Sequence, residues 1–203
     1  MDYIEKMQEL LSIGFSKTEV AENLYLNYHS VINTDEVYKI RKRIASDFKC
    51  NINDVKLIGS AHTGYTYKEG KLLKRDNPKD YDFAIINMDV FVRFFHEVDF
   101  TKIPKDSKEK YTRSILYGKI HPLYVNTKLL RNLEKNNKAI MKDLEVERHI
   151  SVCFYISEQA FIEGLVSYNK GLYTGELKRI REGNPKMEMV DTFEIKEIEK
   201  MED

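Results

Sequence analysis

The sequence predicts an α/β protein in which a mixed β-sheet is flanked by helices and preceded by a helical N-terminal segment. Short runs rich in β-branched and aromatic residues, typical of buried strands, occur at residues 55–58, 80–86 and 147–156. Longer stretches with apolar residues at the helical period lie before, between and after these runs. With 203 residues, 42% of them apolar, the chain is long enough for one substantial hydrophobic core.

Residues 1–36 are predicted to form the helical segment. A first helix stops at Gly14, and Ser16 followed by Glu19 predicts the capping box of a second helix that reaches Leu24. Asp35 is expected to cap a third helix, which belongs to the main domain. The apolar stripes of the first and third helices consist of Ile4, Met7, Leu10 and Leu11, and of Val37, Ile40, Ile44 and Phe48, respectively.

Residues 14–31 also have the pattern of a helix-turn-helix, which opens a DNA-binding alternative. In this hypothesis the segment from Asn27 to Ser30 contacts DNA. The stretch has no basic face, however, and an ordinary pair of helices packed on the core explains the same pattern. A DNA-binding regulator therefore stays an alternative. The pattern rests on Glu19, Val20, Ala21, Leu24, Leu26 and Val31.

The composition excludes several kinds of partner and site. The 33 Lys and Arg residues balance the 33 Asp and Glu residues, so general electrostatic attraction to nucleic acid or anionic lipid is not implied. Cys50 and Cys153 have no neighbouring Cys or His at zinc-site spacing. No apolar stretch has the length of a signal peptide or a membrane span. We expect a reduced, cytoplasmic protein without a membrane partner.

The residues suited to chemistry lie between positions 57 and 86. One apolar run ends at Gly59, where the backbone can approach a ligand closely, and Ser60 follows at an expected helix N-terminus, which favours phosphate. In the next run, strand alternation places Asp80 and Asp82 on one face and Tyr81 on the other. Two carboxylates facing one way repel each other, so a cation is expected between them. Hard oxygen ligands suit Mg²⁺ or Mn²⁺.

Taken together, Ile58-Gly59-Ser60 followed by Asp80-Tyr81-Asp82-Phe83 resembles the hallmark of the nucleotidyltransferase fold of the DNA polymerase beta superfamily. The resemblance covers residues 37–175. It implies that Gly59 and Ser60 hold the triphosphate of an NTP while Asp80 and Asp82 bind the catalytic metals. The implied reaction transfers a nucleoside monophosphate to an acceptor hydroxyl. Gly64 and Thr66 strengthen the match, because many small bacterial members have a second glycine and a hydroxyl residue there.

The sequence departs from the family in two places. First, 19 residues separate Ser60 from Asp80, so an inserted loop or hairpin is expected between them. Second, active members carry a third carboxylate on a neighbouring strand, and the candidate strand at residues 147–156 has Ser151 or His149 at that position. Glu147 lies on the same face and is our candidate for the third catalytic acid, with His149 as an alternative proton acceptor.

The predicted nucleotidyltransferase-like domain, residues 37–175, is completed by helices at 88–98 and 126–146 and by a helix that starts at Ser157 and reaches a turn at Gly171. Residues 176–203 are charged and are expected to form a C-terminal arm or tail. The acceptor stays open among an RNA end, a protein and a small molecule, because proteins similar to this one modify each, some in bacterial defence or toxin systems. Loss of the third acid admits the alternative of a nucleotide- or partner-binding module without catalysis.

Overall fold

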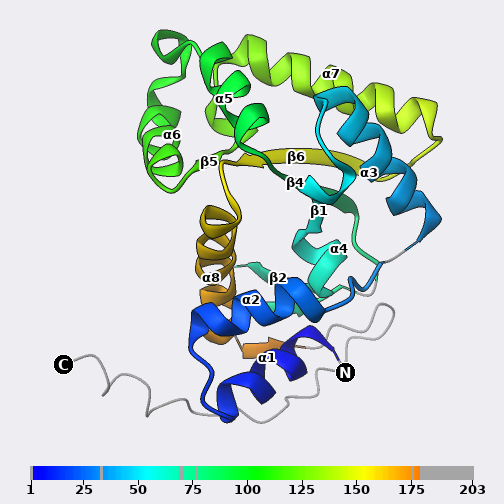
Figure 1. The fold of residues 1–203 in the computed structure, drawn as a ribbon, viewed down its shortest axis with the longest axis vertical. Helices are drawn as coiled ribbons and strands as arrows, with labels where there is room; N and C mark the ends of the chain where they lie inside the picture. Colours follow the sequence, from blue (N-terminus) through cyan, green and yellow to red (C-terminus); the bar gives the residue numbers. More distant parts are fainter. Residues whose placement is uncertain (1, 33, 69–70, 76, 175, 179–203) are drawn as a thin grey trace.

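The centre of the fold is a four-stranded mixed sheet. A computed structural model describes residues 2–32, 34–68, 71–75, 77–174 and 176–178 (Figure 1). The strands lie in the order β1, β4, β6 and β5; β4 runs parallel to β6, and the outer pairs are antiparallel. The predicted α/β class and the three predicted strands are confirmed. The strands are β1 Val55–Ile58, β4 Asp80–Ile86, β5 Lys119–Ile120 and β6 His149–Tyr155.

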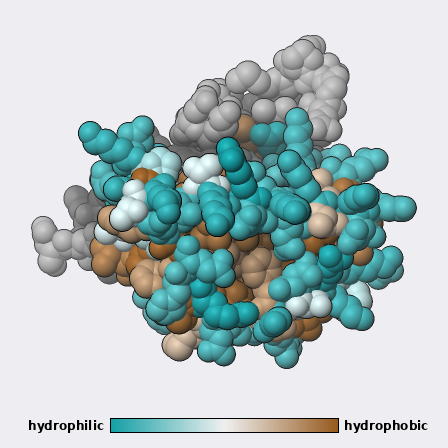
Figure 2. Space-filling model, turned by 90° about the horizontal axis from the view of Figure 1, so that it is seen from above, coloured by the Kyte–Doolittle hydropathy of each residue, from teal (hydrophilic) through white to brown (hydrophobic). Residues whose placement is uncertain are grey.

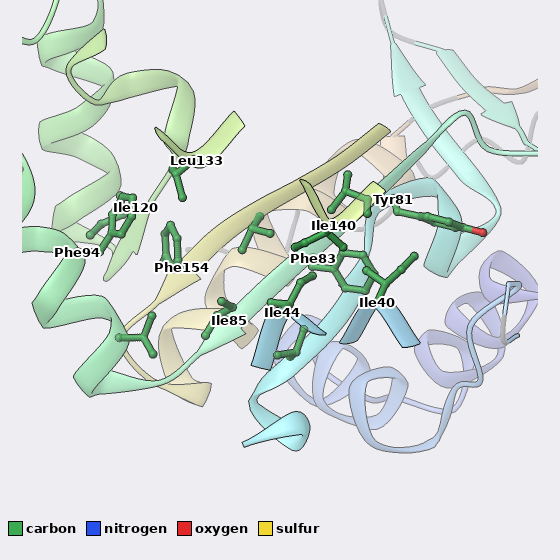
Figure 3. Close-up of a cluster of buried hydrophobic side chains, with 14 of the residues drawn as sticks. Ile40, Ile44, Tyr81, Phe83, Ile85, Phe94, Ile120, Leu133, Ile140 and Phe154 are labelled. Atoms are coloured by element: carbon green, nitrogen blue, oxygen red, sulfur yellow. The ribbon is translucent and has the colours of Figure 1, made fainter. Parts of the chain in front are cut away.

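Three helices cover the first face of this sheet: α3 (Asp35–Phe48), α5 (Met88–Glu97) and α7 (Thr127–Asp143). Alternate residues of β4 and β6 point into the core that the helices enclose (Figure 3). Figure 2 looks down on these helices and shows a mostly hydrophilic outer surface with apolar side chains between the polar ones. The buried strand residues are Tyr81, Phe83, Ile85, Ile150, Val152 and Phe154.

Two helices cover only part of the second face. α2 (Lys17–Asn27) and α8 (Glu158–Thr174) pack over the second half of β4 and β6, where Ala84, Cys153 and Tyr155 are buried. Ser157 accepts a hydrogen bond from the backbone N–H of Ala160, as expected at the start of α8. The predicted turn at Gly171 is wrong, because α8 continues through that residue to Thr174.

The N-terminal helices are packed against the main domain. α1 (Tyr3–Ser12) and α2 share a small core with Tyr65, and Ser16 and Glu19 form the predicted capping box. The predicted cap of α3 is off by one residue: the Thr34 hydroxyl accepts from the Val37 N–H, and Asp35 is the first helical residue. Residues 28–32 are not helical. Asn27 is the last residue of α2, so the segment from Asn27 to Ser30 does not form the second helix of a helix-turn-helix.

A second, smaller sheet contains the expected insertion. After the short helix α4 (Gly59–Thr63), β2 (Tyr65–Lys68) and β3 (Lys71–Lys74) pair as an antiparallel hairpin. β7 (Glu176–Lys178) pairs with β3 in parallel, so the start of the C-terminal arm is a strand; residues 179–203 lie outside the described residues. α8 thereby connects the large sheet to the small one (Figure 1).

No element was predicted for residues 99–125, which contain α6 (Lys105–Leu116) and the strand β5. Tyr111 is the one residue of α6 that is buried, so the helix lacks a strong apolar period. The short 3-10 helices are η1 Ile52–Asp54, η2 Phe100–Lys102 and η3 Pro122–Tyr124. Across the described ranges, no helix combines the length and apolarity needed to cross a membrane.

Candidate functional site

The turn after β1 brings the backbone of Gly59 against Asp82. Gly59 has φ +66°, in the left-handed region that favours glycine, and a Cβ atom placed there would lie 2.7 Å from Asp82 Oδ2. The neighbouring Ile58 pairs with Asp82 across the antiparallel β1–β4 ladder. Glycine is therefore required at this position both by the backbone conformation and by the close carboxylate.

Asp80 and Asp82 project from the start of β4 on the second face of the sheet, as predicted. Asp80 is exposed and Asp82 is half-buried, whereas Tyr81 between them is buried in the core on the opposite face. Within the described part of the chain, no lysine, arginine or histidine forms an ion pair with either carboxylate. Among the residues that the structure describes, the two carboxylates therefore have no ion-pair partner.

The neighbouring strand β6 places two polar residues beside the aspartates. Ser151 pairs with Asp82, and its hydroxyl donates a hydrogen bond to Asp82 Oδ1 at 2.5 Å. His149 pairs with Asp80 and is exposed. Residues paired in parallel strands point to the same face. Ser151 and His149 therefore lie on the same face of the sheet as Asp82 and Asp80, respectively.

Glu147 lies outside the strand that pairs with β4. β6 begins at His149, so the strand alternation used to place Glu147 beside the aspartates does not extend to it. Glu147 is instead exposed and, with Glu36 and Arg148, lines a polar cavity of about 510 Å³. Among the residues that the structure describes, no group of three or more His, Cys, Asp or Glu side chains is arranged to hold a metal ion.

The other predicted nucleotide-binding residues lie along the segment after Gly59. Ser60 is the second residue of α4, and its carbonyl accepts from the Gly64 N–H at 2.9 Å. Gly64 ends this helix with φ +78° and packs against Val31, so a structural role explains it. Thr66 is half-buried in β2 and pairs with Leu73. The structure thus keeps Ser60 next to the Gly59–Asp82 contact, whereas Gly64 ends α4 and Thr66 belongs to the hairpin.

An arginine network that the sequence did not reveal anchors the chain just before Asp80. Arg148 donates to the Tyr81 hydroxyl at 2.6 Å, to Asn77 Oδ1 at 2.8 Å and to the Pro78 carbonyl at 3.1 Å. Tyr81 in turn donates to Glu36 at 2.5 Å, and burial together with this carboxylate raises the pKa of Tyr81. One signal was available, since Arg148 is the one charged residue on the otherwise apolar face of the strand predicted at residues 147–156.

A half-buried histidine, His62, connects α4 to the N-terminal helices. The Ser30 hydroxyl and His62 Nδ1 share a hydrogen bond of 2.6 Å, and the rings of Tyr3 and Tyr28 pack edge-on against the imidazole. Burial lowers the pKa of His62 to about 4, so the ring is neutral at pH 7. His62 is therefore a neutral packing residue behind the turn.

We compared the chain with protein-family models, with curated proteins and with solved structures. None of the three comparisons found a match. The chemical capacity of the site is therefore argued from its own residues. Two carboxylates on alternate positions of a rigid strand, one exposed and one half-buried, have the hard oxygen donors that Mg²⁺ or Mn²⁺ takes in proteins. The donor set fits one such ion, with solvent free to fill its remaining positions.

Proposed function

We propose that the protein is a metal-dependent nucleotidyltransferase that transfers a nucleoside monophosphate from an NTP to an acceptor hydroxyl. The observation that supports this proposal best is the contact between Gly59 and Asp82: an open backbone turn, suited to phosphate, lies directly against a carboxylate suited to a divalent ion. The pairing of Ile58 with Asp82 in the β1–β4 ladder holds the turn at Gly59 beside the Asp82 carboxylate.

Each residue has a role in this proposal. Ser60 and the backbone amides of the turn bind the β- and γ-phosphates. Asp80 and Asp82 hold Mg²⁺ or Mn²⁺, which when bound neutralises charge on the phosphates. The half-buried position of Asp82 keeps its carboxylate in one orientation, while the exposed Asp80 leaves room for the nucleotide and the acceptor.

In the proposed reaction the acceptor oxygen attacks the α-phosphorus and forms a new P–O bond. The bond from the α-phosphorus to the bridging oxygen breaks, and pyrophosphate leaves with the electron pair. The hydroxyl proton passes to the imidazole of His149, which is exposed and pairs with Asp80 on the neighbouring strand. We propose His149 rather than Glu147 because β6 begins at His149.

The test is transfer of label from each α-labelled NTP, with Mg²⁺ or Mn²⁺, to RNA, protein or small-molecule fractions of a bacterial extract. We expect Asp82→Ala to lower transfer by about 100-fold or more, because it removes a charge that acts at the reacting phosphate. Asp89→Ala is the matched control, since Asp89 is an exposed acid in the first turn of α5. Transfer by Asp82→Ala at the wild-type rate would contradict the proposal.

Ser151 supports a second candidate function, a module that binds a nucleotide or a partner without transferring a group. The residue paired with Asp82 is a hydroxyl that already donates its proton to the carboxylate, so it does not accept a proton from a substrate. Nucleotide binding that needs Asp82, without transfer to any fraction, would favour this module. Both functions suit the cytoplasm, because Cys50 and Cys153 are unpaired thiols.

A further inference from the structure

The carboxylate of Asp82 is held from two sides. On one side Ser151 Oγ donates to Oδ1 at 2.5 Å, and on the other Oδ2 lies 2.7 Å from the position that a Cβ atom of Gly59 would take. Asp80, two residues away, is exposed and has no comparable restraint in any hydrogen bond or ion pair of the described residues. The two aspartates are therefore not equivalent as ligands.

We infer that Ser151 is a positioning residue, which engages Oδ1 of Asp82 so that Oδ2, beside Gly59, is presented to a single divalent ion. This inference rests on the proposed function, because it assigns a role to Ser151 in the same metal site. Two ions held 3.5–4 Å apart need carboxylates that bridge them. Ser151 occupies part of the acceptor capacity of Asp82 and adds no negative charge of its own.

The hydroxyl matters because a carboxyl group rotates easily about its terminal torsion. A hydrogen bond from a fixed strand residue removes that freedom before the ion arrives. Partners that orient metal ligands typically contribute about 10- to 100-fold in metal affinity. Ser151 sits in the ladder directly opposite Asp82, so the backbone pairing determines where its hydroxyl points.

A purely structural role for Ser151 makes a different prediction. In that case loss of the hydroxyl would lower the unfolding temperature and leave the ion affinity of the folded protein unchanged. Ser151 is only half-buried, and Asp82 can hydrogen-bond to water if the hydroxyl is removed. We therefore expect the affinity to change more than the stability.

The experiment is a Mn²⁺ titration of the full chain without nucleotide, with free Mn²⁺ measured by electron paramagnetic resonance. We expect one Mn²⁺ per wild-type chain, no binding at this site by Asp82→Ala, and about 10-fold or more weaker binding by Ser151→Ala. Ser151→Thr keeps the hydroxyl on a β-branched residue suited to a strand and should bind within about 3-fold of the wild type. Ser151→Cys, a weak donor of similar size, should resemble Ser151→Ala and replaces it if that variant does not fold.

Three results would overturn the inference: unchanged affinity in Ser151→Ala or Ser151→Cys, two equivalent ions per wild-type chain, or Mn²⁺ binding that does not depend on Asp82. The label-transfer assay tests the proposed function separately. The expected affinities without any transfer would support the role of Ser151 and remove the enzymatic proposal. If the wild type transfers label but the Ser151 variants bind Mn²⁺ with unchanged affinity, the role of Ser151 is overturned and the enzymatic proposal is retained.

Discussion

The two faces of the large sheet use the same strands for different purposes. On the first face, β6 contributes Ile150, Val152 and Phe154, each at most 2% exposed, beneath three helices. On the second face the same strand contributes a half-buried Ser151 at its start and a buried Tyr155 at its end. α2 and α8 cover the second half of this face, and the polar residues lie at its first half. Strand alternation thus places the residues that stabilise the core on one face and the candidate site residues on the other.

The largest expected effect comes from a change on the first face. Phe154 is fully buried and stacks on Phe94 with ring centroids 4.2 Å apart. Phe154→Ala should lower the free energy of unfolding by about 3–5 kcal/mol, because it leaves a cavity in the core. Urea denaturation measures this. Ser151→Ala, on the opposite face of the same strand, should cost about 1 kcal/mol or less, and equal losses in the two variants would refute the separation of the faces.

Acid should destabilise the protein through two half-buried histidines, His62 and His121. Burial lowers the pKa of His62 from 6.5 to about 4, so between these pH values the unfolded chain binds a proton that the folded chain excludes. Stability should therefore fall as the pH drops from about 6.5 to about 4, by up to about 3 kcal/mol from His62. Stability curves at several pH values measure this loss.

The control for this prediction is a pair of single variants. His62→Gln should flatten the pH dependence in that window. His121→Gln should flatten it separately, since burial and Lys119 also lower the pKa of His121 to about 4. A wild-type stability that stays constant from pH 6.5 to pH 4 would contradict the prediction.

A smaller effect is expected at the turn beside the aspartates. Gly59→Ala places a Cβ atom 2.7 Å from Asp82 Oδ2 and forces an alanine to φ +66°, at a cost of about 1–3 kcal/mol. It should also weaken Mn²⁺ binding, because Asp82 must move. Gly14→Ala is the matched control: Gly14 has φ +92° and no atom within 4 Å of the added Cβ. It should cost stability without changing Mn²⁺ binding, and a loss of binding in both would show that the contact is not the cause.

The smallest effect is expected on the first face at the start of β4. Tyr81→Phe removes the hydroxyl that joins Arg148 to Glu36 and should lower the free energy of unfolding by about 1–2 kcal/mol. Tyr38→Phe, at a side chain that is 54% exposed, should change nothing measurable. Chemical denaturation of both variants gives the difference. Equal free energies of unfolding for Tyr81→Phe and Tyr38→Phe would show that the hydrogen bonds of the Arg148 network contribute little to stability.

Much of this arrangement could be predicted because it depends on short-range sequence patterns, such as strand alternation and helix capping. Alternation alone assigned Asp80 and Asp82 to one face and Phe83 to the other, and the capping box at Ser16 fixed the start of α2. The insertion after Ser60 was expected, and its hairpin forms. These features need only residues that are close in the sequence.

The rest depends on distant pairings. The sequence does not specify the register that joins Asp82 to Ser151, nor the reach of Arg148 to Asn77 and Pro78. Glu147 was misplaced because alternation was extended two residues beyond the true start of β6. α6 went unpredicted because only two of its apolar residues, the buried Tyr111 and the partly buried Ile115, pack against the core. Local periodicity thus located the aspartates but not the residues that restrain them.

The parallel pairing of β4 with β6 also determines when the site is completed during folding. β1 and β4 are close in sequence and joined through α4 and a hairpin, so they can pair early, whereas Asp82 and Ser151 are 69 residues apart. Closing so long a loop is entropically costly and slow. On the ribosome, β4 has an unpaired edge until β6 emerges, and an exposed edge beside a large apolar face invites pairing with other chains. Release of a chain truncated before His149 would therefore yield an aggregation-prone product, in which Asp82 has no serine partner.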